Sequence, residues 1–124
     1  MGKLFEQIIK KDNVVKGDGG LYIISSTKRN PNHQNDFKIG LSKNLVRRLD
    51  QYHLCMPRGF WIFDLLVIKE EFKKDVYKLE AKLHRKLKPY EVTNNVRKSK
   101  TEWFRMSEKK MKAAVKEFYE QYKN

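Results

Sequence analysis

Gly20-Leu21-Tyr22-Ile23-Ile24-Ser25-Ser26, followed ten residues later by Phe37-Lys38-Ile39-Gly40-Leu41, is the part of the sequence that decides the fold. Both stretches are rich in branched and aromatic residues, which favour β-strands, and turn-forming residues bound them. The segment 27–36 between them is rich in Asn and contains Pro31, which indicates an extended hairpin connection. The two strands are therefore expected to pair in antiparallel orientation.

Four further stretches place apolar residues at helical spacing. The second can be capped by Ser42 or Asn44, the third stops before Pro89, and the fourth can be capped by Ser107. In the third stretch the predicted buried stripe consists of Val76, Leu79, Leu83 and Leu87. The expected helices cover residues 3–11, about 45–55, 72–87 and 107–122.

Two more apolar segments complete the predicted sheet. Residues 60–68 form a run of aromatic and branched side chains, which indicates a buried strand at the centre of the sheet. Residues 102–106 form a short segment that could add an edge strand. We therefore expect a single α/β (α+β) domain over residues 1–124, in which helices flank a small, mainly antiparallel three-stranded sheet.

The charge of the chain points to a polyanionic partner. Its 124 residues include 28 Lys and Arg against 15 Asp and Glu, which gives a formal net charge of +13 and a pI of about 9.8. Such an excess is unusual for an ordinary soluble enzyme and favours binding to nucleic acid over an acidic membrane surface, because the basic residues recur along the whole chain. DNA is the expected partner, and RNA stays an alternative.

The remaining composition argues against several other classes of protein. The sequence has no apolar run of about 18 residues and no signal-peptide pattern, so we expect an intracellular protein, in the cytoplasm or the nucleus, without a membrane partner. A single cysteine, Cys55, gives no internal disulfide partner. The spacing of that cysteine and the three histidines matches no common zinc pattern.

Five residues of types that suit phosphodiester chemistry lie within or beside these elements. A tyrosine can activate water, an arginine can stabilise charge on phosphoryl oxygens, and one carboxylate on a rigid helix can hold a hydrated magnesium ion. Arg48 is preferred to its neighbour Arg47, because Arg48 flanks the buried helical stripe and Arg47 projects about 100° away. The candidates are Tyr22, Lys38, Arg48, Tyr52 and Glu80.

The order of these residues resembles the GIY-YIG endonuclease superfamily. Its first motif is represented by Gly20-Leu21-Tyr22, its second by Lys38-Ile39-Gly40, its arginine by Arg48 and its metal-binding glutamate by Glu80. The ending Glu102-Trp103-Phe104 is similar to a branch of the superfamily found in phages and large DNA viruses, which often carries Lys-Ile-Gly in the second motif. The resemblance covers most of the chain, with a motif core at residues 20–106.

The resemblance implies a metal-dependent endonuclease that hydrolyses DNA with one magnesium-bound site, in which Mn²⁺ could replace Mg²⁺. Tyr22 and Lys38 would lie near the attacking water, Arg48 and Tyr52 would bind the phosphate, and Glu80 would hold the metal. Tyr52 stands where the superfamily commonly has a histidine or a tyrosine. Nucleic acid would also be contacted by the basic and polar residues Lys43, His84, Asn95, Arg97 and Lys98. Asn94 is an alternative to Asn95, and His84 could instead support Glu80.

Lys38 departs from the family pattern, which usually has a second tyrosine at this position. Lysine could orient Tyr22, hold a phosphate as a point charge, or act as the base itself, and it could equally be a solvated lysine at the edge of a strand. This departure keeps a second hypothesis open, a non-catalytic nucleic-acid-binding module on the same scaffold. A third, an assembly or packaging protein, needs only the charge. The sequence does not distinguish cleavage specificity or oligomeric state.

Overall fold

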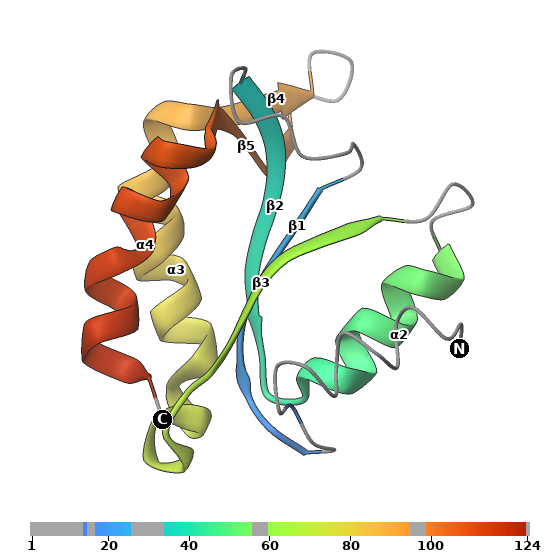
Figure 1. Cartoon of the computed structure of the whole chain (residues 1–124), viewed down its shortest axis with the longest axis vertical. Helices are drawn as coiled ribbons and strands as arrows, with labels where there is room; N and C mark the ends of the chain where they lie inside the picture. The colour runs from blue at the N-terminus through green and yellow to red at the C-terminus, as the bar shows by residue number, and fades with distance from the viewer. Residues whose placement is uncertain (1–13, 15–16, 26–33, 56–59, 95–98, 124) are drawn as a thin grey trace.

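The computed structural model describes residues 14, 17–25, 34–55, 60–94 and 99–123. The predicted helix over residues 3–11 and the candidates Asn95, Arg97 and Lys98 lie outside these ranges. The elements follow one another along the chain (Figure 1) as β1 (Gly20–Ser25), β2 (Gln34–Ser42), α2 (Leu45–Cys55), β3 (Trp61–Val67), the 3-10 helix η1 (Glu70–Asp75), α3 (Val76–Leu87), the 3-10 turn η2 (Lys88–Tyr90), β4 (Glu91–Asn94), β5 (Ser99–Ser107) and α4 (Glu108–Tyr122).

The sheet has five strands in the order β3-β1-β2-β5-β4, and every neighbouring pair is antiparallel. The antiparallel pairing of β1 with β2 is confirmed, and its register places Tyr22 opposite Gly40. The prediction of three strands was wrong. Residues 91–94 form the additional strand β4, and the expected edge segment at 102–106 is the longer strand β5, which lies between β2 and β4.

The central position predicted for residues 60–68 was also wrong, because β3 is at one end of the sheet. Its apolar character comes from packing of its faces, and Leu65 and Leu66 are the residues of β3 that are buried. A run of apolar residues indicates that the faces of a strand are buried, but it does not indicate whether the strand has neighbouring strands on one edge or on both. In the same way, the sequence pattern indicates no strand at residues 91–94, because pairing with β5, rather than local sequence, makes these four residues the strand β4.

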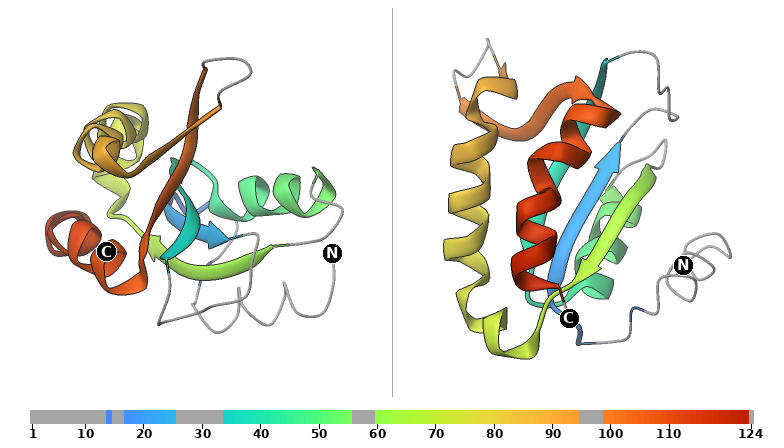
Figure 2. Two further views of the ribbon diagram at one scale, coloured as in Figure 1. Left: turned by 90° about the horizontal axis from the view of Figure 1, so that it is seen from above. Right: turned by 60° about the vertical axis from the view of Figure 1, so that its left-hand side comes forward.

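Helices cover both faces of the central strands, with α2 on one face and α3 and α4 on the other (Figures 1 and 2). Alternate side chains of β1 enter the two cores, so that Leu21 and Ile23 pack towards α3 and α4, and Tyr22 and Ile24 pack towards α2. Because both faces are covered, every residue of β1 is buried. This double burial explains the continuous apolar sequence of the strand.

The helices flanking the site form largely as their apolar spacing predicts. The predicted stripe of α3 is buried throughout, although the segment before Val76 is a 3-10 helix rather than part of α3. The helix ends at Leu87, before Pro89. Ser107 caps α4 as expected, because its Oγ accepts the backbone N–H of Lys110 at 3.2 Å. Within the described ranges, no helix combines the length and the hydropathy that crossing a membrane requires.

A close approach of two strands explains why position 20, the start of the Gly20-Leu21-Tyr22 motif, is a glycine. A Cβ built on Gly20 would lie 1.9 Å from the carbonyl oxygen of Leu66 in β3, a distance that no side chain tolerates. The absence of a side chain therefore lets the start of β1 approach β3 closely. This approach fixes the strand that carries Tyr22, two residues further on.

Candidate active site

Tyr22 and Tyr52 form a partly buried hydroxyl pair between the sheet and α2. Their hydroxyl oxygens lie 2.8 Å apart, and their rings meet edge to face with centroids separated by 5.6 Å. Tyr22 is 0% exposed and Tyr52 is half-buried, so the pair faces solvent on the Tyr52 side. Alternation along β1 places Tyr22 on the face covered by α2, and Tyr52 comes from the last turn and a half of that helix.

Arg48 lies beside this pair. It is one helical turn before Tyr52, so its guanidinium and the Tyr52 phenol share one face of α2. Partial burial by itself would lower the pKa of Arg48, but the interactions with the adjacent Tyr52 side chain and with the Tyr22 phenol outweigh burial. The carboxylate of Glu80 acts in the same direction, so the pKa is raised above its ordinary value and the guanidinium stays charged.

Glu80 reaches the same place from α3. Its Oε2 accepts the backbone N–H of Leu41 at 2.6 Å, which fixes the carboxylate against β2. A Cβ built on Gly40 would lie 2.3 Å from the hydroxyl oxygen of Tyr22 and 3.1 Å from Oε2 of Glu80. The phenol and the carboxylate therefore converge on one point, and only a glycine leaves room for both. This convergence explains why the Lys38-Ile39-Gly40 motif has a glycine at position 40.

Helix α3 completes the hydrogen bonding of β2 where β5 no longer does. The β2–β5 ladder runs from Gln34 to Lys38, and beyond it the side chains of α3 meet the backbone of β2. Glu80 accepts the Leu41 N–H, and Nε2 of His84 donates to the carbonyl oxygen of Ile39 at 2.6 Å. A carbonyl can only accept, so the contact requires the proton on Nε2. His84 thus has a structural partner, and its predicted contact with nucleic acid stays a prediction.

Lys38 projects its amine between two aromatic rings. Its Nζ lies 5.4 Å from the ring centroid of Tyr52 and 5.6 Å from that of Trp103, which lies in β5. Aromatic faces attract cations, so this position suits a positive charge held at a fixed place. Lys38 is two residues before Gly40, so its side chain lies on the same face of the sheet. Gly40 pairs with Tyr22, whose side chain lies on the face covered by α2, and this explains why Lys38 reaches α2.

The structure thus brings together all five candidate catalytic residues, from four different elements. It also shows neighbours that sequence reasoning missed. A cleft of about 190 Å³ begins at Arg48 and is also lined by Tyr77 and by Arg47, which is exposed. Tyr77 could have been found from its position three residues before Glu80, because residues three apart share a helix face. The predicted nucleic-acid contact Lys43 also lines this cleft.

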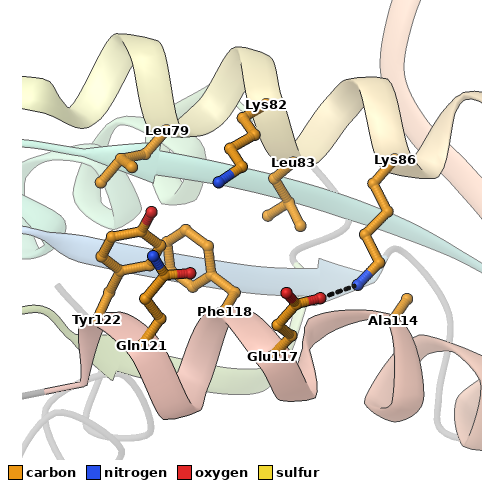
Figure 3. Close-up of a pocket in the computed structure, with 9 residues that line it drawn as sticks. All are labelled: Leu79, Lys82, Leu83, Lys86, Ala114, Glu117, Phe118, Gln121 and Tyr122. Carbon is orange, nitrogen blue, oxygen red and sulfur yellow. Dashed lines mark hydrogen bonds and ion pairs between the residues drawn. The ribbon is translucent and has the colours of Figure 1, made fainter.

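A second hollow, of about 110 Å³, lies between α3 and α4 (Figure 3). Leu79, Leu83 and Phe118 make its lining largely apolar, and an ion pair of 3.3 Å between Lys86 and Glu117 closes one side. None of the candidate site residues that the structure describes lines this hollow. We therefore place the candidate chemistry at the Arg48 side of the molecule.

Residues 19–119 match the sequence model of a family described as the T5orf172 domain. No curated protein and no solved structure matches the chain.

Proposed function

Because the chain belongs to the T5orf172 domain family, a phage-associated family of a nuclease-related group, we propose that it is a metal-dependent endonuclease of the GIY-YIG type that hydrolyses DNA. The observation that carries the proposal is the hydrogen-bonded pair of Tyr22 and Tyr52, which has the Arg48 guanidinium and the Glu80 carboxylate close to it. Tyr22 and Glu80 are 58 positions apart in the sequence, yet both reach this site. The chain also carries a net charge of +13. The family and the charge both favour nucleic acid as the substrate.

Arg48 and the two tyrosines give the proposed order of proton transfer. In this proposal the Arg48 guanidinium donates to the oxygen of the adjacent Tyr52, and the Tyr52 hydroxyl then donates to Tyr22. The step begins with Tyr22 as the phenolate, and Arg48 supplies a positive charge near it. As Tyr52 takes a proton from the attacking water, it gives its own proton to the Tyr22 phenolate, so the number of protons is conserved. The half-buried Tyr52 is the member of the pair that meets the water.

Two cations stabilise the phosphate in this proposal. Arg48 presents a planar guanidinium that can donate to two phosphoryl oxygens. Lys38, held between two aromatic rings, supplies a second positive charge that stabilises charge developing in the transition state. Among the roles left open for Lys38 by the sequence, the position between the rings favours an electrostatic one over that of a base.

Glu80 is the residue that would hold the metal ion, Mg²⁺ with Mn²⁺ as a possible substitute. Magnesium is typically bound by one or two carboxylates, several waters and substrate phosphates, so a single carboxylate fits it. The described part of the chain has no group of three or more His, Cys, Asp or Glu side chains suited to a metal, which fits zinc poorly. The bound ion would supply positive charge at the leaving oxygen. The Leu41 N–H on Oε2 orients the carboxylate, and Oε1 would be the ligand.

The test is cleavage of supercoiled plasmid DNA with Mg²⁺, with Mn²⁺ and with EDTA. We expect nicked and linear products that EDTA abolishes. Glu80→Gln keeps a hydrogen-bond acceptor for Leu41 but removes the charge, and it should lower the rate by about 100-fold or more if the metal contributes several kcal/mol. The matched control is Glu71→Gln, an exposed glutamate on η1, which should cleave at the wild-type rate.

Wild-type activity in Glu80→Gln would refute the metal role of Glu80. An absence of products with either metal would refute the nuclease and favour a non-catalytic nucleic-acid-binding module. One observation supports this second candidate, since Glu80 and His84 both complete the backbone hydrogen bonding of β2 and so have structural roles that need no chemistry. Such a module predicts salt-sensitive DNA or RNA binding with no turnover. A packaging or assembly protein is supported by charge alone.

A further inference from the structure

The cleft beside Arg48 has cations and an aromatic ring in its walls. It lies between the first turns of α2 and the start of α3, and Lys43, Arg47, Arg48 and Tyr77 line it together with small polar side chains. The side chains known to line it include three cations and no carboxylate. Like charges held together repel one another, so this arrangement is stabilised when an anion binds.

Tyr77 is the unusual member of this group. Its side chain is 68% exposed, although the stripe of α3 beside it is buried. Nζ of Lys43 lies 5.5 Å from the Tyr77 ring centroid and leaves most of the ring accessible. An exposed tyrosine is ordinary by itself, and a cation over it can simply add a little stability. Its position in the wall of a cationic cleft that continues from Arg48 is what indicates a ligand.

The chemistry of the walls selects a nucleotide. Cations bind phosphate, and an exposed aromatic ring stacks on a nucleobase. The cleft, at about 190 Å³, is smaller than the pockets of about 300–1,000 Å³ that hold whole small molecules, which suits one unit of a longer ligand. A base within a duplex already has both faces covered by its neighbours, so a base that stacks on Tyr77 has to be unpaired.

We propose that this cleft binds an unpaired nucleotide next to the phosphate held by Arg48, with its base stacked on Tyr77 and its phosphate on Lys43 and Arg47. The preferred substrate is then DNA with an unpaired nucleotide beside the cleavage position, such as a bulge or a flap, rather than continuous duplex. The location of the cleaved phosphate rests on the proposed function. The binding of the unpaired nucleotide does not need cleavage and can be measured without it.

The experiment uses DNA that carries the fluorescent base 2-aminopurine, either as a single-nucleotide bulge or fully paired in an otherwise identical duplex. Binding is followed with the full chain in EDTA, so that cleavage does not interfere. We expect tighter binding of the bulged DNA and quenching of its fluorescence, because quenching reports stacking. Tyr77→Leu should weaken binding of bulged DNA by about 5- to 100-fold and abolish the quenching, with little change for paired DNA. Tyr77→Phe should retain both signals.

Trp61→Leu is the matched control, because Trp61 is an exposed aromatic residue on β3 that does not line the cleft. It should bind and quench like the wild type. Equal affinity for the two DNAs, or unchanged quenching in Tyr77→Leu, overturns the proposal even if the protein cleaves plasmid DNA. Quenching that depends on Tyr77 supports binding of the unpaired nucleotide even if no metal produces cleavage. Failure of this proposal is therefore distinguishable from failure of the proposed nuclease function.

Discussion

Gly40→Ala tests whether the site is built around a missing side chain. The new methyl carbon would lie 2.3 Å from the Tyr22 hydroxyl oxygen and 2.6 Å from its Cζ, both far inside van der Waals contact. Tyr22 is fully buried, so its ring cannot move into solvent. We expect the variant to lose about 1–3 kcal/mol of unfolding free energy, the usual cost of overpacking. Displacement of the ring should also break its hydrogen bond to Tyr52 and lower cleavage.

A double-mutant cycle isolates this contact from other effects of the substitution. Tyr22→Leu removes the Cζ and the hydroxyl that the methyl group meets, so Gly40→Ala should cost much less in the Tyr22→Leu background. Urea unfolding of the four proteins gives the coupling energy, expected at about 1–3 kcal/mol. Additive effects of the two substitutions, within about 0.5 kcal/mol, would show that the tyrosine ring does not occupy the space above Gly40.

Two further predictions concern stability. Glu80→Ala leaves the buried Leu41 N–H without its acceptor and should cost about 1–3 kcal/mol in urea unfolding, whereas Glu80→Gln should cost clearly less; equal costs would contradict the hydrogen bond. Burial, and then the hydrogen bond and charge of Asp64, raise the pKa of Tyr119. The folded protein therefore keeps this proton above about pH 10, where the unfolded chain loses it, and stability falls as the pH rises further. The unfolding free energy of Tyr119→Phe, measured by urea unfolding, should therefore fall less between about pH 9 and 11 than that of the wild type. An equal fall in the two proteins would exclude Tyr119 as its source.

Much of the fold could be predicted because local patterns report burial. The stripe of α3, the cap of α4 and the hairpin of β1 and β2 depend on neighbouring residues that share a face or a turn. The order of the strands could not be predicted in this way. Pairing with distant segments places β3 at the end of the sheet and makes β4 a strand. The periodicity of side chains along a segment does not indicate which other segment it pairs with.

The candidate site shows the same division. The spacing of Arg48 and Tyr52 by one helical turn could be read from the sequence, and the structure places both on α2 beside Tyr22. The two backbone groups of β2 that Glu80 and His84 satisfy could not be foreseen, because they are exposed only where β5 leaves the sheet. The angle of Arg47 on the helix points it away from the buried stripe, and Arg47 is indeed exposed, but only the structure shows that it lines a cleft together with Tyr77 of α3.

The sequence by itself determined which residue types and which helix or strand faces this protein brings to its centre, since these follow from composition and from periods of two and 3.6 residues. Only the tertiary structure decided that the Tyr22 phenol and the Glu80 carboxylate meet over Gly40. The physical reason is that this meeting requires two elements far apart in the chain to approach within the volume of one missing methyl group. Such a distance depends on the packing of the whole domain, which no local pattern encodes.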